Sequence, residues 1–219
     1  MKYSAPIYAA VLFLMGRQEG FPQGFINLDF ENSIPTNVVT LGPGVVVGDA
    51  IIPGWVAYLN GSPTTIVRFN AQSSNGGVAL IGTAAVPPIQ GNYFIMLNGA
   101  AVFQGTAGIG QTGTIPSTAQ SLIFWGNVGA NDVTFEGQIL PLTVLESTNN
   151  YNVYGADISA FANQSGELLF TVESHGQDSI DNIQFSSAAV PEPDEFGLTV
   201  IGSLLLGFSY LRKWQLRAV

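Results

Sequence analysis

Residues 55–69 read Trp-Val-Ala-Tyr-Leu-Asn-Gly-Ser-Pro-Thr-Thr-Ile-Val-Arg-Phe and contain the pattern that decides the fold. Two runs rich in apolar, β-branched and aromatic residues, Trp55–Leu59 and Thr64–Phe69, flank the turn-forming residues Asn60-Gly-Ser-Pro63. Gly and Asn permit the backbone angles of tight turns, and Pro presets one of them. The stretch therefore predicts two short β-strands joined by a turn.

The same unit recurs through the middle of the chain. Further strand-like runs lie at residues 26–30, 78–81, 93–97, 122–128, 138–145, 167–174 and 180–186. Turn formers such as Pro53-Gly54 separate them, and the one helical feature is Asp157–Ala162, where the first residue can cap a single turn. About nine or ten short strands with no long amphipathic helix predict an all-β fold, a jelly-roll β-sandwich.

Charge is scarce and unevenly distributed along the chain. Of the 219 residues 10% are charged, with 6 Lys and Arg against 15 Asp and Glu. Between residues 20 and 189 Arg68 is the only basic residue against eleven acidic ones, so this segment carries about −10. Such a segment repels phosphate backbones, which excludes nucleic-acid binding. The chain has no Cys, so it has no thiol nucleophile and no disulfide.

The N-terminus is predicted to be an export signal. Lys2 precedes a mostly apolar stretch from Ala5 to Met15, which is the order found in secretory signal segments. We assign residues 1–19 to this segment. The alternative is that the stretch forms a buried first strand of the sandwich.

The C-terminus combines a rigid motif, an apolar span and a basic tail. The motif is Val190, Pro191, Glu192 and Pro193, and the tail begins with Arg212 and Lys213. Between them, residues 196–211 carry no charge and would form a helix about 24 Å long, close to the thickness of a hydrocarbon core. The basic tail is expected to stay in the cytoplasm, which places the preceding domain across the membrane.

This three-part order resembles the PEP-CTERM sorting signal of Gram-negative bacteria. The resemblance implies recognition by an exosortase, a membrane transpeptidase that cuts near the Pro-Glu-Pro motif. It also implies export, a transient anchor in the inner membrane through the C-terminal transmembrane helix, and later association with the outer surface or the exopolysaccharide of the extracellular matrix. The chain then consists of a signal segment (1–19), a β-sandwich ectodomain (20–187) and the sorting signal (188–219).

Three stretches of the central region resemble the galactose-binding-like jelly rolls, which include many carbohydrate-binding modules. They are residues 27–31, 52–55 and 180–183, with Leu28 in place of the usual Gly. In that family, residues of the first and last strands meet and often share a structural calcium ion. The resemblance therefore implies Ca²⁺ ligands at Glu31 and Asp181 with an oxygen of Asn27 nearby, and oxygen ligands suit calcium. The alternative is that these are polar positions at strand edges.

Aromatic residues are the candidates for ligand binding, because their faces pack against the C–H surfaces of sugar rings. Tyr151 and Tyr154 are predicted to form an exposed pair in an Asn-rich segment. Trp55 follows a Pro-Gly turn, so it is either an anchor of the core or a loop residue that binds ligand. Trp125 lies in a continuous apolar run and is predicted to be buried.

Motifs for catalysis are missing from the sequence. His175 is the only histidine, and Gly108–Gly113 matches a dinucleotide-binding pattern without the helix pattern that must follow it. A glycan-cleaving enzyme would need two carboxylates facing one cleft. The sequence thus predicts a non-catalytic, exported protein of the cell surface or exopolysaccharide matrix, sorted by an exosortase and associated with polysaccharide. The alternative is a carbohydrate-binding module with one defined glycan ligand.

Overall fold

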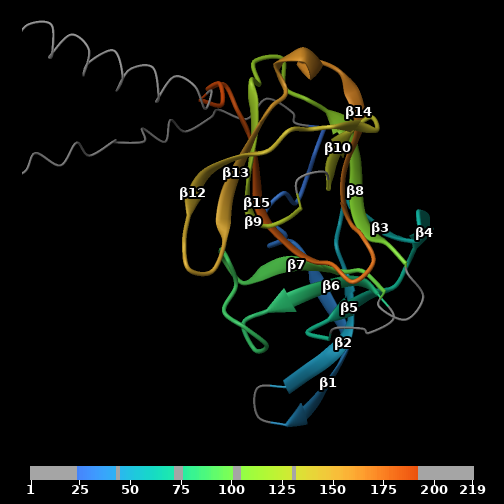
Figure 1. Cartoon of the computed structure of the whole chain (residues 1–219). Coiled ribbons are helices and arrows are strands. Elements are labelled where there is room, and N and C mark those ends of the chain that lie inside the picture. The colour runs from blue at the N-terminus through green and yellow to red at the C-terminus, as the bar shows by residue number, and fades with distance from the viewer. Residues whose placement is uncertain (1–23, 43–44, 72–75, 101–104, 130–131, 192–219) are drawn as a thin grey trace, which may run out of the picture.

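A computed structural model of the chain describes residues 24–42, 45–71, 76–100, 105–129 and 132–191. This part of the chain is all-β, with two sheets in a sandwich-like arrangement (Figure 1). The predicted signal segment 1–19 lies outside the described residues, as do Glu192, Pro193, Arg212 and Lys213 with the apolar span between them. Among the residues described, no helix is long and apolar enough to cross a membrane.

The larger sheet has nine strands, in the spatial order β1 (Ile34–Gly42), β2 (Val45–Ile51), β5 (Val67–Phe69), β6 (Gly77–Gly82), β7 (Tyr93–Asn98), β15 (Gln177–Ser186), β9 (Ser121–Asn127), β13 (Asn152–Asp157) and β12 (Thr143–Ser147). The smaller sheet has six, in the order β11 (Gln138–Ile139), β10 (Val133–Phe135), β14 (Ser165–Val172), β8 (Ala107–Thr114), β3 (Val56–Leu59) and β4 (Ser62–Thr64). Neighbouring strands are antiparallel except for β5 and β6, which pair in parallel.

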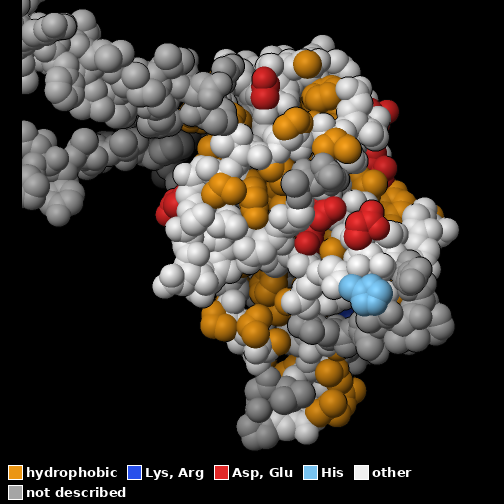
Figure 2. Space-filling model, in the orientation of Figure 1, with side chains coloured by type: hydrophobic (Ala, Val, Ile, Leu, Met, Phe, Trp, Pro, Cys, Tyr) orange, Lys and Arg blue, Asp and Glu red, His pale blue; other side chains and the backbone are white. Residues whose placement is uncertain are grey.

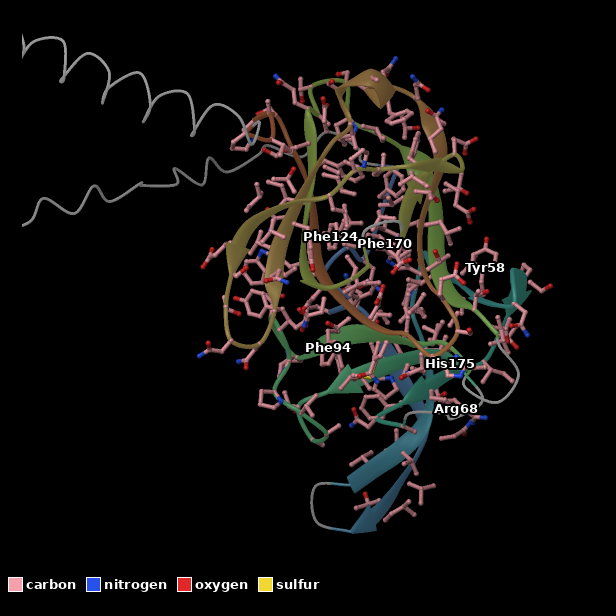
Figure 3. All side chains as sticks on the ribbon, viewed as in Figure 1. Tyr58, Arg68, Phe94, Phe124, Phe170 and His175 are labelled. Atoms are coloured by element: carbon pink, nitrogen blue, oxygen red, sulfur yellow. The ribbon has the colours of Figure 1, made fainter. Side chains whose placement is uncertain are left out.

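The hydrophobic core lies between the two sheets. Phe124 of β9 meets Phe170 of β14 edge to face with ring centroids 5.2 Å apart, and Figure 3 shows these two rings between the sheets. Trp55 packs against Phe30 and Phe170 at 5.4 and 6.4 Å. All buried members of this main core fall between Phe25 and Phe185. Residues 24–191 therefore contain a core of their own.

The prediction of a strand at residues 26–30 is wrong. Asn27 and Phe30 have φ angles of 51° and 57°, in the left-handed region, and the N–H of Phe30 donates to the carbonyl of Asn27 at 3.3 Å. The segment is a pair of turns that buries Phe30 completely and leaves Ile26 exposed. The period-two pattern of Ile26, Leu28 and Phe30 is not reflected in their burial, because only Phe30 is fully buried while Leu28 is half-buried and Ile26 is exposed.

The predicted strand at residues 138–145 is in fact two strands in different sheets. β11 ends at Ile139 in the smaller sheet, and β12 begins at Thr143 in the larger one. Pro141 lies between them and cannot donate a ladder hydrogen bond. The predicted single turn at Asp157–Ala162 is confirmed as a 3₁₀ turn, Ser159–Phe161, in which the Asp157 carboxylate accepts the N–H of Ser159 at 2.9 Å.

The outer face of the larger sheet is partly covered by residues 83–92, which connect β6 to β7 and which we call the cover loop. Ile89 of the cover loop and Met96 pack on a second apolar cluster formed by Ala79, Ile81 and Phe94. These side chains point away from the main core, because residues on one strand alternate between its two faces. The cover loop forms one wall of the site described next.

Candidate functional site

A hollow of about 560 Å³ lies on the outer face of the larger sheet, between the cover loop and the turn that joins β12 to β13. Its walls are residues 86–89 of the cover loop and residues 149–151 of the turn, and its floor is formed by Phe94, Met96, Asn127 and residues 177–179. Figure 1 shows the tip of the β12–β13 hairpin directly above the cover loop. The site is thus built from three strands and two loops that are distant in sequence.

The cover loop is held by Glu31 and Asp181, the two carboxylates that the sequence analysis predicted as calcium ligands. Glu31 accepts hydrogen bonds from the backbone N–H and side-chain amide of Asn92 at 2.6 and 2.9 Å and from the N–H of Tyr93 at 3.0 Å. Asp181 accepts the N–H of Gln90 at 2.8 Å. Gly91 lies between these contacts with φ +58°, and a Cβ there would collide with the Glu31 carboxylate.

Asp181 is completely buried, and its charge is not balanced by a cation among the described side chains near it. Burial raises the pKa of Asp181 to about 7 against the opposing effect of hydrogen bonds from Gln90 and Asn182, and the negative charges of Glu31 and Asp29 raise it further. Burial also acts to raise the pKa of Glu31, but its hydrogen bonds outweigh that effect and lower it. Glu31 and Asp181 therefore lie close enough for their charges to interact.

Asn27, the third predicted calcium ligand, forms hydrogen bonds to Asn32 and Trp55 in the structure. Its side-chain oxygen accepts the N–H of Asn32 at 2.9 Å, and its backbone carbonyl accepts the indole N–H of Trp55 at 3.0 Å. These bonds stabilise the turns of residues 27–33. In the described part of the chain no group of three or more His, Cys, Asp or Glu side chains is arranged to hold a metal ion, and calcium binding stays a prediction.

The expectation of an exposed Tyr151–Tyr154 pair is wrong for Tyr154. Tyr154 is buried, and its ring stacks on Phe124 at 5.3 Å in the main core. The two residues face each other in the β13–β9 register, so both point inward. Trp55 is likewise buried and occupies the core, which leaves it with no exposed face for a ligand.

Tyr151 has a different aromatic partner, Trp125, which the sequence predicted to be buried. The two rings stack with centroids 5.5 Å apart and planes inclined by only 11°, and both are partly exposed. Trp125 points outward because Phe124, its neighbour on β9, points inward. The outward orientation of Trp125 could have been predicted from the alternation of faces along a strand. The continuous apolar run from Leu122 to Trp125 instead indicated that the whole strand is buried.

The turn that carries Tyr151 is fixed by Thr148. The Thr148 hydroxyl accepts the N–H groups of Asn150 and Tyr151 at 3.2 and 3.0 Å and donates to the carbonyl of Tyr151 at 2.7 Å. Asn127 donates its side-chain amide to the carbonyl of Asn150 at 3.1 Å, which ties the turn to β9. The aromatic stack is therefore set on a braced support before any ligand arrives.

The polar groups around the hollow are mostly uncharged amides and hydroxyls. They belong to Asn127, Asn149, Asn150, Gln177 and Ser179. Among the described residues that line the hollow there is no Lys or Arg, and the side chain of the one acidic residue, Asp178, lies on the inner face of the sheet beside its register partner Leu97. Such a lining offers hydrogen-bond donors and acceptors to a neutral polar ligand and no counter-charge to an anion.

Asp178 is itself largely withdrawn from solvent, with 6% of its surface exposed. Burial raises the pKa of Asp178 to about 7, and the charge of Asp132 and a hydrogen bond to its carboxyl raise it further, against a lowering contact from the N–H of Gly129. Oδ2 of Asp178 has no donor, and Asp132 already accepts the Gly129 N–H at 2.9 Å. With a pKa of about 7, Asp178 carries a proton at acidic pH in the folded protein and can then donate it in a hydrogen bond to Asp132.

Comparisons with known proteins leave the family of the chain open. No family model matches it, and no curated protein matches it. Among solved structures, it is similar to the crystal structure of the enzymatically active domain of tailspike protein 4 from bacteriophage CBA120, with 16% identity and a TM-score of 0.35. The match covers 62% of this chain and only 20% of the tailspike chain. A likeness at this level assigns neither a fold family nor an activity to the chain.

Proposed function

We propose that the protein is a non-catalytic polysaccharide-associated protein of the cell surface or exopolysaccharide matrix, and that the hollow beside Tyr151 is where it contacts the glycan. The observation that carries the proposal is Tyr151, a partly exposed ring that lines an amide-rich hollow and stacks on Trp125 behind it. Aromatic faces pack against sugar rings, and a few convergent polar groups then fix their orientation.

The charge of the site favours neutral sugars over uronic acids or sulfated sugars. The lining side chains that the structure describes include no cation to pair with an anionic sugar, and the whole chain carries a net charge of −9. An acidic polymer would approach against that field. A single shallow platform of this kind supports affinities of roughly millimolar to micromolar, about −4 to −8 kcal/mol.

Export and sorting are supported by the ends of the chain. The Pro-Glu-Pro motif, the uncharged span and the Arg212-Lys213 pair are expected to be recognised by an exosortase after the signal segment has directed export. Ser121 donates to the carbonyl of Ala188 at 2.7 Å, so the chain is still attached to the sandwich two residues before Val190. Intact-mass analysis of the surface fraction tests this part, because the mature protein should lack residues 196–219.

A structural calcium ion is a second element of the proposal. Its support is Asp181, a fully buried carboxylate that feels the charges of Glu31 and Asp29. A divalent cation would offset this repulsion, and it would fit the jelly-roll topology that we also propose for the sandwich. Thermal melting with calcium and with chelator tests the ion, and unchanged curves would argue against it.

Non-catalytic action is proposed because Asp178 is the one acidic residue of the described lining, and its register with the core residue Leu97 directs its side chain to the inner face of the sheet, away from the hollow. Glycoside hydrolysis needs two carboxyl groups on either side of the scissile bond. The test is a pull-down of residues 24–191 on matrix polysaccharide, with reducing ends measured in the same tube. Retention without new reducing ends supports the proposal, and steady release that is lost in Asp178→Asn would make the protein an enzyme.

A further inference from the structure

The β1–β2 hairpin projects beyond the sandwich and carries an exposed apolar surface. β2 pairs with β5 only at Gly48 and Asp49, so most of the hairpin extends past the neighbouring strand, as Figure 1 shows at the lower end of the molecule. β1 is an edge strand of nine residues, and the backbone N–H and C=O groups on its outer side have no strand partner within the described sheet.

The apolar side chains of the hairpin are about half exposed or more. Their exposed fractions are 54% for Ile34, 46% for Val38, 53% for Val39, 67% for Leu41 and 54% for Ile51. Figure 2 shows hydrophobic side chains clustered on this projecting tip. Contiguous exposed apolar residues of this kind are uncommon on soluble domains and mark interaction surfaces.

The hairpin also lacks charge. From Ser33 to Gly48 the sequence contains no Asp, Glu, Lys or Arg, and the next residue, Asp49, is paired with Arg68 at 3.1 Å. The chain as a whole carries −9, so two copies repel each other over most of their surfaces. A charge-free edge is where a second copy can approach with the least repulsion.

We propose that β1 pairs edge to edge with β1 of a second copy, in antiparallel orientation, so that the two larger sheets become one sheet across a two-fold axis. The open backbone groups of β1 can hydrogen-bond to a strand of a second copy, whereas a lipid phase could not satisfy them. A two-fold interface uses the same surface on both copies and closes on itself, so it forms a dimer rather than a fibre.

The opposite edge of the same sheet is less suited to this role. β12 is shorter and carries Glu146, so two copies paired there would bring like charges together.

In β1 the irregularities between Thr36 and Val39 and between Thr40 and Gly42 interrupt the ladder of hydrogen bonds to β2. These bulges confine pairing to a short stretch, which suits a specific contact better than open-ended stacking.

This inference is independent of the hollow, since no hairpin residue lines it. If the proposed function holds, a dimer would present two glycan sites and would therefore bind a polymer more tightly than one copy does. Failure of dimerisation would leave glycan binding by one copy intact.

Because the chain contains no Cys, an introduced cysteine can form a disulfide only with the same cysteine of a second copy. We would prepare the full chain in mild detergent as the single variants Val38→Cys and Thr40→Cys, with Val144→Cys on β12 as the matched control. Val38 and Val144 are similarly exposed, at 46% and 51%, so chance collisions affect them alike. The expected result is a covalent dimer from at least one hairpin variant and several-fold less from the control.

A second experiment introduces lysines into the hairpin and measures the mass of the protein in solution. In sedimentation analysis the full chain should have twice the protomer mass, and Val39→Lys combined with Leu41→Lys should halve it while Val144→Lys leaves it unchanged. Circular dichroism checks that the variants keep the sandwich. A wild-type chain that stays monomeric, or a dimer that survives the hairpin lysines, overturns the proposal. Binding of neutral phosphatidylcholine vesicles through the hairpin by a monomer would instead make it a membrane contact.

Discussion

Replacing Asp178 by Asn should make the protein more stable at alkaline pH and remove part of its pH dependence. The pKa of Asp178 rises from an ordinary 3.8 to about 7 in the folded protein. The folded state therefore binds a proton more tightly than the unfolded state, and stability falls as the pH rises from about 4 to about 7. A difference of 7 − 3.8, about three units at 1.4 kcal/mol each, gives up to about 4 kcal/mol.

Asn has the shape of Asp, and its amide can donate permanently to Asp132, where the wild type needs a shared proton. Asp178→Asn should thus match the wild type at or below about pH 4, where the wild-type carboxyl is protonated in both states, and exceed it at pH 8 by as much as about 4 kcal/mol. Urea unfolding of residues 24–191 at the two pH values measures the effect. Asp49→Asn serves as the control, because this carboxylate is half exposed in an ion pair. A variant less stable than the wild type at pH 8 would refute the shared proton.

Three further substitutions test other parts of the account. Gly91→Ala should destabilise the fold by about 1–3 kcal/mol in urea unfolding, because an L-residue is strained at φ +58° and its Cβ would collide with Glu31. An unchanged urea midpoint would mean that Glu31 does not hold the cover loop as described. Trp55→Phe should cost about 1–3 kcal/mol in the same assay, since it removes the shorter of the two hydrogen bonds to the carbonyl of Asn27 and leaves only the 3.3 Å bond from the N–H of Phe30. A neutral result would show that the indole bond does not stabilise the turns. Asp181→Ala should abolish any rise in melting temperature caused by calcium, and a rise that persists would place the ion elsewhere.

The strands that the sequence predicted correctly are those that can be recognised from their own residues. Tyr93–Leu97 and residues 180–186 are β-branched or aromatic runs closed by turn formers, and they form β7 and part of β15. β8 was missed because it contains three glycines, which lower strand propensity. It forms because β3 and β14 pair with it on both sides. Such non-local pairing is not visible in a local pattern.

The site was predictable only in part for the same reason. The resemblance placed Glu31 and Asp181 in one calcium site, which stays a prediction, and in the structure both carboxylates hold the cover loop and the start of β7. The inward orientation of Tyr154 depends on its register with Phe124 on β9, thirty residues away in sequence. The Trp125–Tyr151 stack depends on the same register together with the braced turn at Thr148. Neither follows from residue type.

The central claim is that the Trp125–Tyr151 stack binds neutral sugar, and tryptophan fluorescence tests it most directly. Residues 24–191 contain two tryptophans, of which Trp55 is buried and Trp125 is partly exposed, so a ligand at the hollow should alter the emission of Trp125. Titration with neutral oligosaccharides of glucose, galactose and mannose should give a saturable change for at least one, with a Kd of roughly millimolar to micromolar. Tyr151→Ala should weaken that binding at least tenfold, whereas Val144→Ala should not. The absence of a saturable change with every sugar, or equal binding by Tyr151→Ala, would contradict the account.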